Sequence, residues 1–365
     1  MRHSVDTPFL LISGILTLFG LLIFTSAAMG LLARGGASFS SVAISQVLLG
    51  LVGGGIALFI IANMDYRKWR AWTPHFFVFS LFLTALTLTH FGLSLKGASR
   101  WLVIGPISFQ PVEILKLASV ALLAALFSAR IKDIRSVRAS FVPFLTVVGI
   151  ASAVLLLQPD THGVVMIAVA GAAMLFAAGG RVSYLASLAL LGIVVIGMLA
   201  WYRPYLRARF ETFLNPGADA LGAGYQVQQS LIAVGSGGMW GRGFGQSMEK
   251  FSYLPEPIGD SIFAVAAEEF GFIGSTLLVL LFAAFALLGL RVAARSPDAF
   301  GSLMVVGLVV LIAGQSFVNI GTAIGIVPLS GLPLIFVSHG GTALAISLAE
   351  VGVILSVSRR MKSAD

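Results

Sequence analysis

The sequence predicts an all-helical integral membrane protein with ten transmembrane helices and one long loop on the outer side. Two observations lead to this fold class. Hydrophobic residues make up 58% of the 365 residues and charged residues only 10%, whereas soluble domains carry about 25% charged residues. The charged residues are also separated by apolar gaps that suit the ~20 residues needed to cross the hydrocarbon core. So much apolar side chain cannot be hidden in one water-soluble core, and the excess is expected to face lipid.

The charge-free gaps give the spans in order. Seven gaps fit one crossing each, and they lie between residues 6–34, 34–65, 70–96, 138–160, 160–181, 181–203 and 269–291. A shorter apolar run, 111–128, adds an eighth. The 51 residues between Asp298 and Glu350 carry no charge and fit two more crossings, divided by the Gly- and Pro-containing stretch 325–333. We therefore expect ten helices in a single domain, residues 1–365.

The first apolar run, 8–32, ends near Ser26-Ala27-Ala28, which resembles a signal-peptide cleavage site. The hydrophobic core of a signal peptide has about 7–15 residues, and this run is longer. A retained span is therefore the favoured interpretation, and a cleaved signal peptide is the alternative.

The basic residues indicate how the chain is oriented. Lys and Arg concentrate in cytoplasmic loops, and ten crossings place both termini on one side. If that side is the cytoplasm, the inner segments hold 14 of the 23 Lys and Arg residues. The net charge of +8 is explained by this topology, and the chain lacks the basic helix or basic–aromatic run that nucleic acid would need. The chain has no cysteine, which excludes disulfides and cysteine-ligated zinc.

The other basic residues lie mostly in two outer segments, 96–116 and 203–250. Positive charge on the outer side has no role in topology. It therefore indicates either ion pairs with loop carboxylates or a site for an anion that faces outward.

The loop 202–260 has 59 residues, and loops this long are usually functional or disordered. Its several aromatic residues argue against disorder. Within it, residues 225–234 are expected to form a short amphipathic helix. The Gly-rich run 235–245 that follows fits either a flexible loop or a set of backbone N–H groups that bind an anion.

Asp260 ends this loop, directly before an apolar run. Asp is favoured as a helix N-cap, so capping is one prediction. The other is a carboxylate at the membrane surface, which partial burial makes a better proton acceptor near neutral pH. Glu268 and Glu269 follow about two to three helical turns later, and one of them is expected to face the same cavity.

The other outer segment, 96–116, contains Glu113 and Lys116, which are three residues apart and therefore share one helix face. Ionisable groups at the membrane edge are costly and usually functional; a structural ion pair is the alternative. Trp101 alone is typical of an interfacial anchor. The five His residues are scattered, so a His-rich metal site is not expected.

Short motifs recur along almost the whole chain, in segments 97–101 (Gly-Ala-Ser-Arg-Trp), 109–116, 158–163 (Gln-Pro-Asp-Thr-His-Gly), 207–210, 224–230, 241–245, 253–260, 268–271, 319–321, 328–333 and 338–341. In this order they resemble the signature of the SEDS family (shape, elongation, division and sporulation proteins), which includes FtsW and RodA. Segments 250–256 and 328–341 look closer to FtsW than to RodA. Two positions depart from the family pattern: Ile258-Gly259 stand where His-Thr is frequent, and His339 stands where Tyr is common.

The resemblance implies a ten-helix glycosyltransferase of the bacterial cytoplasmic membrane. It would polymerise lipid II into glycan strands at the outer face, for cell division or cell shape. It would work with a class B penicillin-binding protein, a transpeptidase, and with other divisome or elongasome membrane proteins. Both termini would be cytoplasmic.

The resemblance, together with what such a reaction requires, predicts roles for individual residues. Asp260 would be the catalytic carboxylate. Arg100, Lys116 or Arg242 would stabilise the leaving pyrophosphate, with or without a divalent cation such as Mg²⁺ or Mn²⁺. The residues expected at the substrate are Arg100, Trp101, Glu113, Lys116, Arg242, Lys250, Glu256 and Glu269.

Two other classes of function stay open. Ten helices with polar intramembrane groups suit a transporter or a flippase for a lipid-linked precursor. A non-catalytic scaffold of the divisome is the third interpretation.

Overall fold

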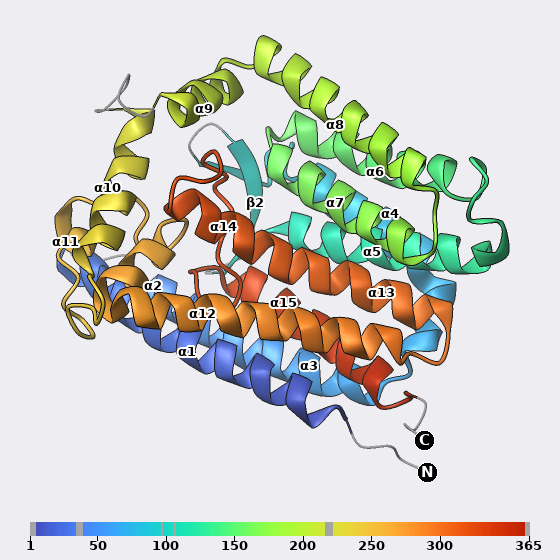
Figure 1. The fold of residues 1–365 in the computed structure, drawn as a ribbon, viewed down its shortest axis with the longest axis horizontal. Coiled ribbons are helices and arrows are strands. Elements are labelled where there is room, and N and C mark those ends of the chain that lie inside the picture. The colour runs from blue at the N-terminus through green and yellow to red at the C-terminus, as the bar shows by residue number, and fades with distance from the viewer. Residues whose placement is uncertain (1–4, 34–38, 96–97, 105–106, 216–221, 362–365) are drawn as a thin grey trace.

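The computed structural model describes residues 5–33, 39–95, 98–104, 107–215 and 222–361. Long helices lie side by side and form most of the molecule (Figure 1). The long helices, with two π-helical turns that continue them, are α1 (Thr7–Ala33), α2 (Phe39–Ile44) with Ser45–Gly53 and α3 (Gly54–Asn63), α4 (Trp69–Leu86), α5 (Pro111–Ala129), α6 (Phe141–Leu157), α7 (Thr161–Ala177), α8 (Val182–Tyr202), α12 (Ile262–Ala294), α13 (Ala299–Val309) with Val310–Gly314 and α14 (Gln315–Ala323), and α15 (Gly341–Ser358). The short elements are the 3₁₀ turns Tyr66–Lys68 and Ile131–Asp133, the helices α9 (Pro204–Leu214), α10 (Ala223–Ser236) and α11 (Glu249–Ser252), and the strands β1 (Gly92–Leu95), β2 (Ala98–Ile104) and β3 (Ile107–Phe109).

Within these described residues, seven helical stretches are long and apolar enough to cross a membrane, namely α1, Phe39–Asn63, α5, α8, α12, Ala299–Ala323 and α15. The apolar helices α6 and α7 are shorter. α4 has 18 residues and contains Pro74. The prediction of a helical protein with many membrane spans is therefore confirmed, while three of the ten expected crossings correspond to shorter or less apolar helices.

Burial separates the central helices from the peripheral ones. In α15, 89% of the apolar stretch is buried, against 6% in α8. α15 packs against α3, the turn Ser45–Gly53 and α13. α8 runs along the edge of the bundle beside α7 (Figure 1). An apolar helix that stays uncovered is expected to face lipid.

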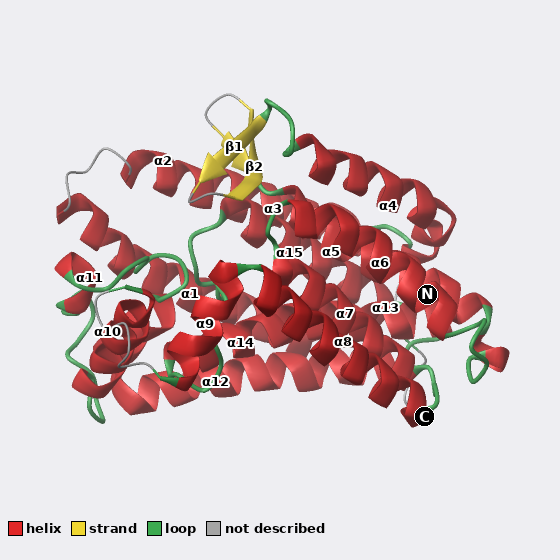
Figure 2. Ribbon diagram, turned by 90° about the horizontal axis from the view of Figure 1, so that it is seen from above, coloured by secondary structure: helices red, strands yellow, loops and turns green. Residues whose placement is uncertain are grey.

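One region departs from the all-helical prediction. The strands β1, β2 and β3 form an antiparallel sheet in the order β1-β2-β3, in which Trp101 is opposite Leu93 and Leu102 is opposite Phe109. The sheet stands at the edge of the bundle near α2 and α4 (Figure 2). Its strands have three to seven residues, too few for their alternation to stand out in so apolar a sequence.

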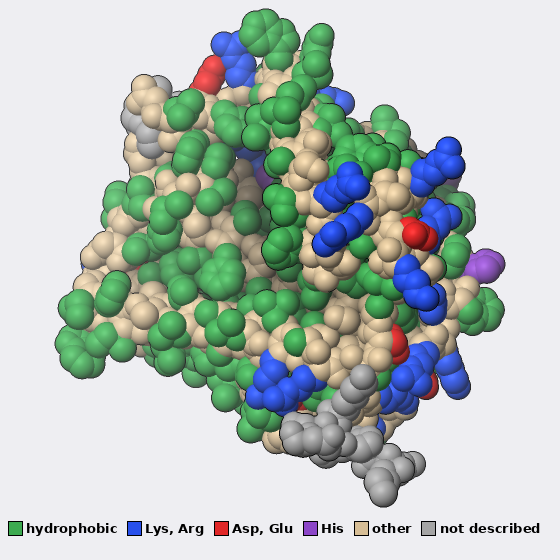
Figure 3. Space-filling model, turned by 45° about the vertical axis from the view of Figure 1, so that its right-hand side comes forward, with side chains coloured by type: hydrophobic (Ala, Val, Ile, Leu, Met, Phe, Trp, Pro, Cys, Tyr) green, Lys and Arg blue, Asp and Glu red, His purple; other side chains and the backbone are tan. Residues whose placement is uncertain are grey.

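The two ends of the chain meet at one end of the bundle (Figure 1). The backbone N–H of Asp6 donates to Ser358 Oγ over 3.1 Å, and the Asp6 carboxylate pairs with Arg291 at 2.7 Å. Lys and Arg side chains gather over this end, while much of the remaining surface in view is hydrophobic (Figure 3).

Candidate active site

Asp260 lies where the long loop enters α12. Its carbonyl oxygen accepts a hydrogen bond from Asn319 Nδ2 (2.9 Å), and the same nitrogen donates to Leu332 O (2.7 Å). The N-cap of α12 is Ser261, which makes no side-chain capping bond. The predicted capping role of Asp260 is therefore wrong, because the helix begins two residues beyond it.

The carboxylate of Asp260 lies near a guanidinium that comes from the long loop. A Cβ atom at Gly331 would stand 3.5 Å from Asp260 Oδ2 and 3.5 Å from Arg209 Nη2. The two charged groups therefore approach the same glycine. Gly331 has a φ of +66°, a conformation that favours glycine, so the chain can turn at this point without a side chain between the charges.

Arg209 is held in place by several contacts. Its Nη1 donates to Leu329 O (2.8 Å) and Ser330 O (3.2 Å) and lies 2.6 Å from His162 Nε2. The guanidinium also stacks over Tyr205, 4.3 Å from the ring centroid. Burial lowers the pKa of Arg209, and the nearby charge of Asp260 acts in the opposite direction. The result is a fixed, partly desolvated cation beside the carboxylate.

Arg100 brings the small sheet to the same region. Its side chain donates to the carbonyl oxygens of Gln158 (3.4 Å) and Pro159. Its guanidinium interacts electrostatically with both His162 and Arg209. Asp160, which caps α7 by accepting from Gly163 N (3.2 Å), also acts on His162.

These contacts and charges unite four segments that are far apart in sequence: β2, the start of α7, α9 and the residue before Ser261 at the start of α12. We call the resulting set the outer charge cluster, after the side of the membrane predicted for its segments; it consists of Arg100, Asp160, His162, Arg209 and Asp260.

The predicted pair Glu113–Lys116 is confirmed, with 2.7 Å between Glu113 Oε2 and Lys116 Nζ. The side chains are only 7% and 4% exposed. Lys116 Nζ also donates to Gln315 Oε1 (2.8 Å), and Gln315 Nε2 donates to Pro333 O (3.2 Å). The pair thus reaches, through Gln315, the segment that holds Arg209.

The Gly-rich run after α10 is inserted into a break in α12. At Gly271 the helix is interrupted by a φ of 66° and a ψ of −166°. In a continuous helix the N–H groups of residues 272 and 273 would donate to the carbonyls of 268 and 269. Four bonds replace these two: Phe272 N to Gly238 O (2.8 Å), Ile273 N to Met239 O (3.2 Å), Arg242 N to Glu268 O (3.0 Å) and Gly243 N to Glu269 O (3.0 Å).

This insertion explains the glycines. A Cβ at Gly237 would lie 2.1 Å from Ala267 O, and one at Gly241 would lie 2.1 Å from Glu269 O. The backbones therefore approach too closely for any side chain. Because the N–H groups of Arg242 and Gly243 are used by α12, the anion-binding interpretation of this run is wrong for those two groups.

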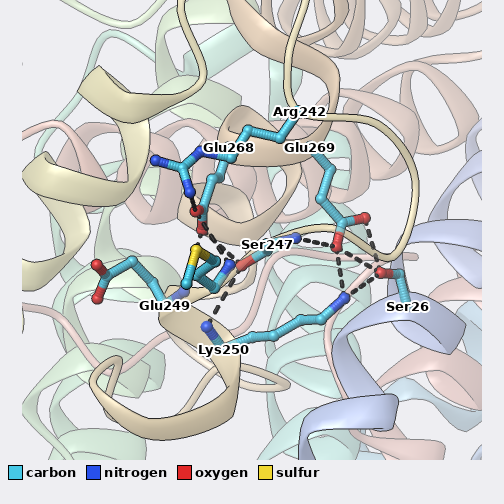
Figure 4. A network of polar contacts seen from close by, with 8 residues as sticks. Ser26, Arg242, Ser247, Glu249, Lys250, Glu268 and Glu269 are labelled. Carbon is cyan, nitrogen blue, oxygen red and sulfur yellow. Dashed lines mark hydrogen bonds and ion pairs between the residues drawn. The ribbon is translucent and has the colours of Figure 1, made fainter.

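A network of polar contacts lies beside this break (Figure 4). Lys250 Nζ is 2.6 Å from Glu269 Oε1 and 2.8 Å from Ser26 Oγ on α1. Ser26 Oγ donates to the Glu269 carboxylate, 2.6 Å and 2.7 Å from its two oxygens. Lys250 and Glu269 are 0% and 1% exposed. Both side chains are occupied inside the protein, which differs from the expected contact with substrate.

The neighbouring Glu268 faces the loop. Its carboxylate accepts from Ser247 Oγ (2.5 Å) and Met248 N (3.1 Å) and pairs with Arg242 at 3.4 Å. The contacts of the two carboxylates that are given above all lead away from the outer charge cluster. This differs from the expectation that Glu268 or Glu269 shares the cavity of Asp260.

The structure also places two further residues that were predicted to lie at the substrate, Glu256 and Trp101. Glu256 is exposed, its carbonyl accepts from Gly259 N (3.0 Å) and Ser261 N (3.2 Å), and its charge acts on His339. Trp101 is half-buried in β2.

The sequence alone gave no separate role to Arg209, His162 or Ser26. Arg209 and His162 lie in recognised motifs, which was the available signal, whereas nothing in the sequence connects Ser26 to Lys250.

The chain is similar to known proteins over almost its whole length. A family model described as cell cycle protein, which covers FtsW, RodA and SpoVE, matches residues 6–363. The chain belongs to this family. The resemblance deduced from the motifs is therefore confirmed.

Individual members of the FtsW/RodA/SpoVE family show the same extent of similarity. Stage V sporulation protein E of Bacillus subtilis (strain 168) is 44% identical over 308 residues, 84% of each chain. The probable peptidoglycan glycosyltransferase FtsW of Geobacter sp. (strain M18) is 34% identical over 366 residues, 99% of each chain. A solved structure described as "Structural coordination of polymerization and crosslinking by a peptidoglycan synthase complex" superposes with a TM-score of 0.79 at 26% identity, covering 98% of both chains.

Proposed function

We propose that this chain is a peptidoglycan glycosyltransferase that polymerises lipid II at the outer face of the cytoplasmic membrane, with Asp260 as general base. Its family and its FtsW relative, similar over 99% of both chains, support transfer of a glycosyl group in cell-wall synthesis. The observation that carries the site is the approach of Asp260 and Arg209 to Gly331, because it sets a proton acceptor beside a half-buried cation.

The distribution of charge supports the proposed orientation. We assign ten crossings, the seven candidate spans together with α4, α6 and α7. Lys and Arg gather at the end where both termini lie, and such residues favour the cytoplasmic side. α12 ends at this face near Arg291, so its other end, with Asp260, would face outward.

The proposed reaction uses the outer charge cluster. Asp260 accepts the proton of the GlcNAc 4-hydroxyl of the acceptor, and that oxygen attacks the anomeric carbon of the donor. The new glycosidic bond forms as the bond to the pyrophosphate oxygen breaks, and undecaprenyl pyrophosphate leaves with the electron pair. Fixed cations stabilise such developing charge because they need no reorganisation.

Arg209 and Arg100 are the cations best placed for the pyrophosphate. Lys116 is bonded to Glu113 and Gln315, and Arg242 pairs with Glu268. A divalent cation, Mg²⁺ or Mn²⁺, would add charge stabilisation. Among the residues that the structure describes, no three His, Cys, Asp or Glu side chains gather to hold one, so the substrate pyrophosphate itself would supply part of the ligands.

The partner would be a class B penicillin-binding protein that crosslinks the strands. This is supported by the solved structure described above, which concerns a complex that coordinates polymerization and crosslinking. Other divisome or elongasome membrane proteins would complete the assembly.

The test is Asp260→Asn in purified, reconstituted protein supplied with lipid II and a partner. General base catalysis contributes about 10²–10⁴-fold, and we expect the polymerisation rate to fall by at least that much while folding and partner binding are kept. Asp298→Asn, at the N-cap of α13 near the termini, is the matched control and should retain activity. Substantial polymerisation by Asp260→Asn would refute the assignment of Asp260 as general base.

The same preparation separates the alternatives. A transporter or flippase would move labelled lipid II across the bilayer without forming glycan strands. A non-catalytic scaffold would support growth of cells that carry Asp260→Asn.

A further inference from the structure

We infer that Lys250 and Glu269 are positioning residues. Together with Ser26, they hold the first part of α12, Ile262–Phe270, in the orientation that Asp260 needs. The three side chains are called the α1–α12 lock. The inference rests on the proposed role of Asp260 as general base.

The lock joins three elements at one point. Ser26 belongs to α1, Lys250 to α11 and Glu269 to α12. The Lys250 ammonium is within 2.8 Å of both partners, and Ser26 Oγ lies within 2.7 Å of both carboxylate oxygens of Glu269. With the Glu269 carboxylate held from two sides, its rotamer is fixed (Figure 4).

The break at Gly271 turns the first part of α12 into a separate arm, Ile262–Phe270. Glu269 stands at one end of this arm, and Asp260 lies just before the other end. A helix of nine residues is about 13 Å long, so a tilt of about 5° at the lock would move the Asp260 end by about 1 Å. A misplacement of about 1 Å in an active site can cost on the order of 100-fold in rate.

The Asp260 end of the arm has its own supports. Asn319 holds the carbonyl of Asp260, Ser338 Oγ donates to Gly259 O (2.8 Å), and His339 N donates to Ile258 O (2.7 Å). These bonds limit how far the end can move when the lock is lost. We therefore expect a decrease nearer to 10-fold than to 100-fold.

Burial argues that the lock acts through position and not through substrate contact. Lys250 and Glu269 are 0% and 1% exposed, so a sugar or a pyrophosphate could reach them only if the loop left α12. Their loss should therefore lower kcat and leave KM for lipid II unchanged, which is the signature of a group that matters only in the transition state.

The decisive variant is Lys250→Met/Glu269→Gln in the full chain, reconstituted with its partner. Removal of one member of a buried ion pair leaves an uncompensated charge and is strongly destabilising, whereas removal of both charges is often neutral. We expect an unchanged unfolding temperature, a kcat lower by about 10-fold and a KM for lipid II within about twofold of wild type. Asp6→Asn/Arg291→Met removes an ion pair near the termini and should keep kcat.

The outcomes separate this inference from the proposed function. An unchanged kcat in the folded double variant overturns the lock, as does a higher KM with unchanged kcat, since that would mean direct substrate binding. If Asp260→Asn is inactive while the double variant is fully active, only the proposed role of the lock is refuted. If Asp260→Asn is active, the proposed role of Asp260 as general base is refuted. If the double variant does not fold, Ser26→Ala decides by the same comparison of kcat and KM, because it deletes only one hydroxyl.

Discussion

Arg209 Nη2 and Asp260 Oδ2 both approach Gly331: each atom lies 3.5 Å from the position that a Cβ atom would take at that glycine. Arg209 belongs to α9 and Asp260 precedes α12. The long loop therefore brings its own cation to its own carboxylate, and the carbonyl groups of Leu329 and Ser330 hold the Arg209 guanidinium in place beside Gly331.

Arg209→Met should lower kcat/KM for lipid II by about 10²–10³-fold, as expected for removal of one fixed charge from a site where charge develops. Arg209→Lys should recover only part of this loss, because an ammonium cannot reproduce the forked contacts of a guanidinium. Steady-state polymerisation of lipid II measures both effects. Arg207→Met is the control: Arg207 is 67% exposed and pairs with Glu211. Equal losses at positions 207 and 209 would contradict a specific role for Arg209.

Gln315→Glu separates two functions of one side chain. A carboxylate at this position can still pair with Lys116, but it cannot donate to Pro333 O as the amide does over 3.2 Å. The segment that holds Arg209 would lose this support, and we expect the polymerisation rate to fall by about 10-fold. Ser316→Ala, which removes a bond within the same helical stretch, should have little effect. A fully active Gln315→Glu would show that the bond to Pro333 does not matter.

Gly241→Ala and Gly271→Ala should destabilise the fold. Each position has a positive φ, which alone costs about 1–3 kcal/mol with a side chain, and each new Cβ would lie within 2.2 Å of the opposing backbone. Gly235→Ala is the matched control, since Gly235 lies in α10 with open space around it. That change should stabilise by about 0.5–1 kcal/mol. Unfolding temperatures measured in detergent should be lower than wild type for Gly241→Ala and Gly271→Ala and slightly higher for Gly235→Ala. A wild-type unfolding temperature for Gly241→Ala or Gly271→Ala would argue against the inserted loop.

His339 should make stability depend on pH. Burial lowers the pKa of His339, although the charge of Glu256 acts in the opposite direction. The unfolded chain therefore takes up the proton at a higher pH than the folded protein. The contribution of His339 to stability is complete above about pH 6.5 and is lost as the pH falls from there through the folded pKa.

The measurement is the unfolding temperature between about pH 7.5 and about pH 5, the range in which His titrates. His339→Gln should lower this temperature less on acidification than wild type does. His75→Gln, at an exposed position on α4, should behave like wild type. An identical pH profile for His339→Gln would refute the prediction.

Several elements could be predicted because their cause is local. The start of α5 follows from Pro111, since proline fits the first turn of a helix. The amphipathic helix expected at 225–234 is found as α10, Ala223–Ser236. The ion pair of Glu113 and Lys116 follows from helical spacing.

The features that escaped prediction depend on contacts across the chain. Arg209 is one of nine basic residues assigned to the outer side, and only the fold shows that it meets Asp260. Gly271 lies inside an apolar run that fits a continuous helix, and the break requires Gly241 from another segment. In the sequence, nothing distinguishes Lys250 from the other basic residues of the loop, and only the fold shows its contacts with Ser26 and Glu269.

The insertion of the Gly-rich run into α12 also decides how relatives can be recombined. Residues 237–243 and 268–273 complete each other's backbone bonds, so they form a single unit of exchange. A chimaera that takes the run from one relative and the broken helix from another must keep Gly237, Gly241 and Gly271 together. Grafts that lose one of these glycines would produce a misfolded hybrid, whereas grafts that carry both segments would transplant the arm with its carboxylate.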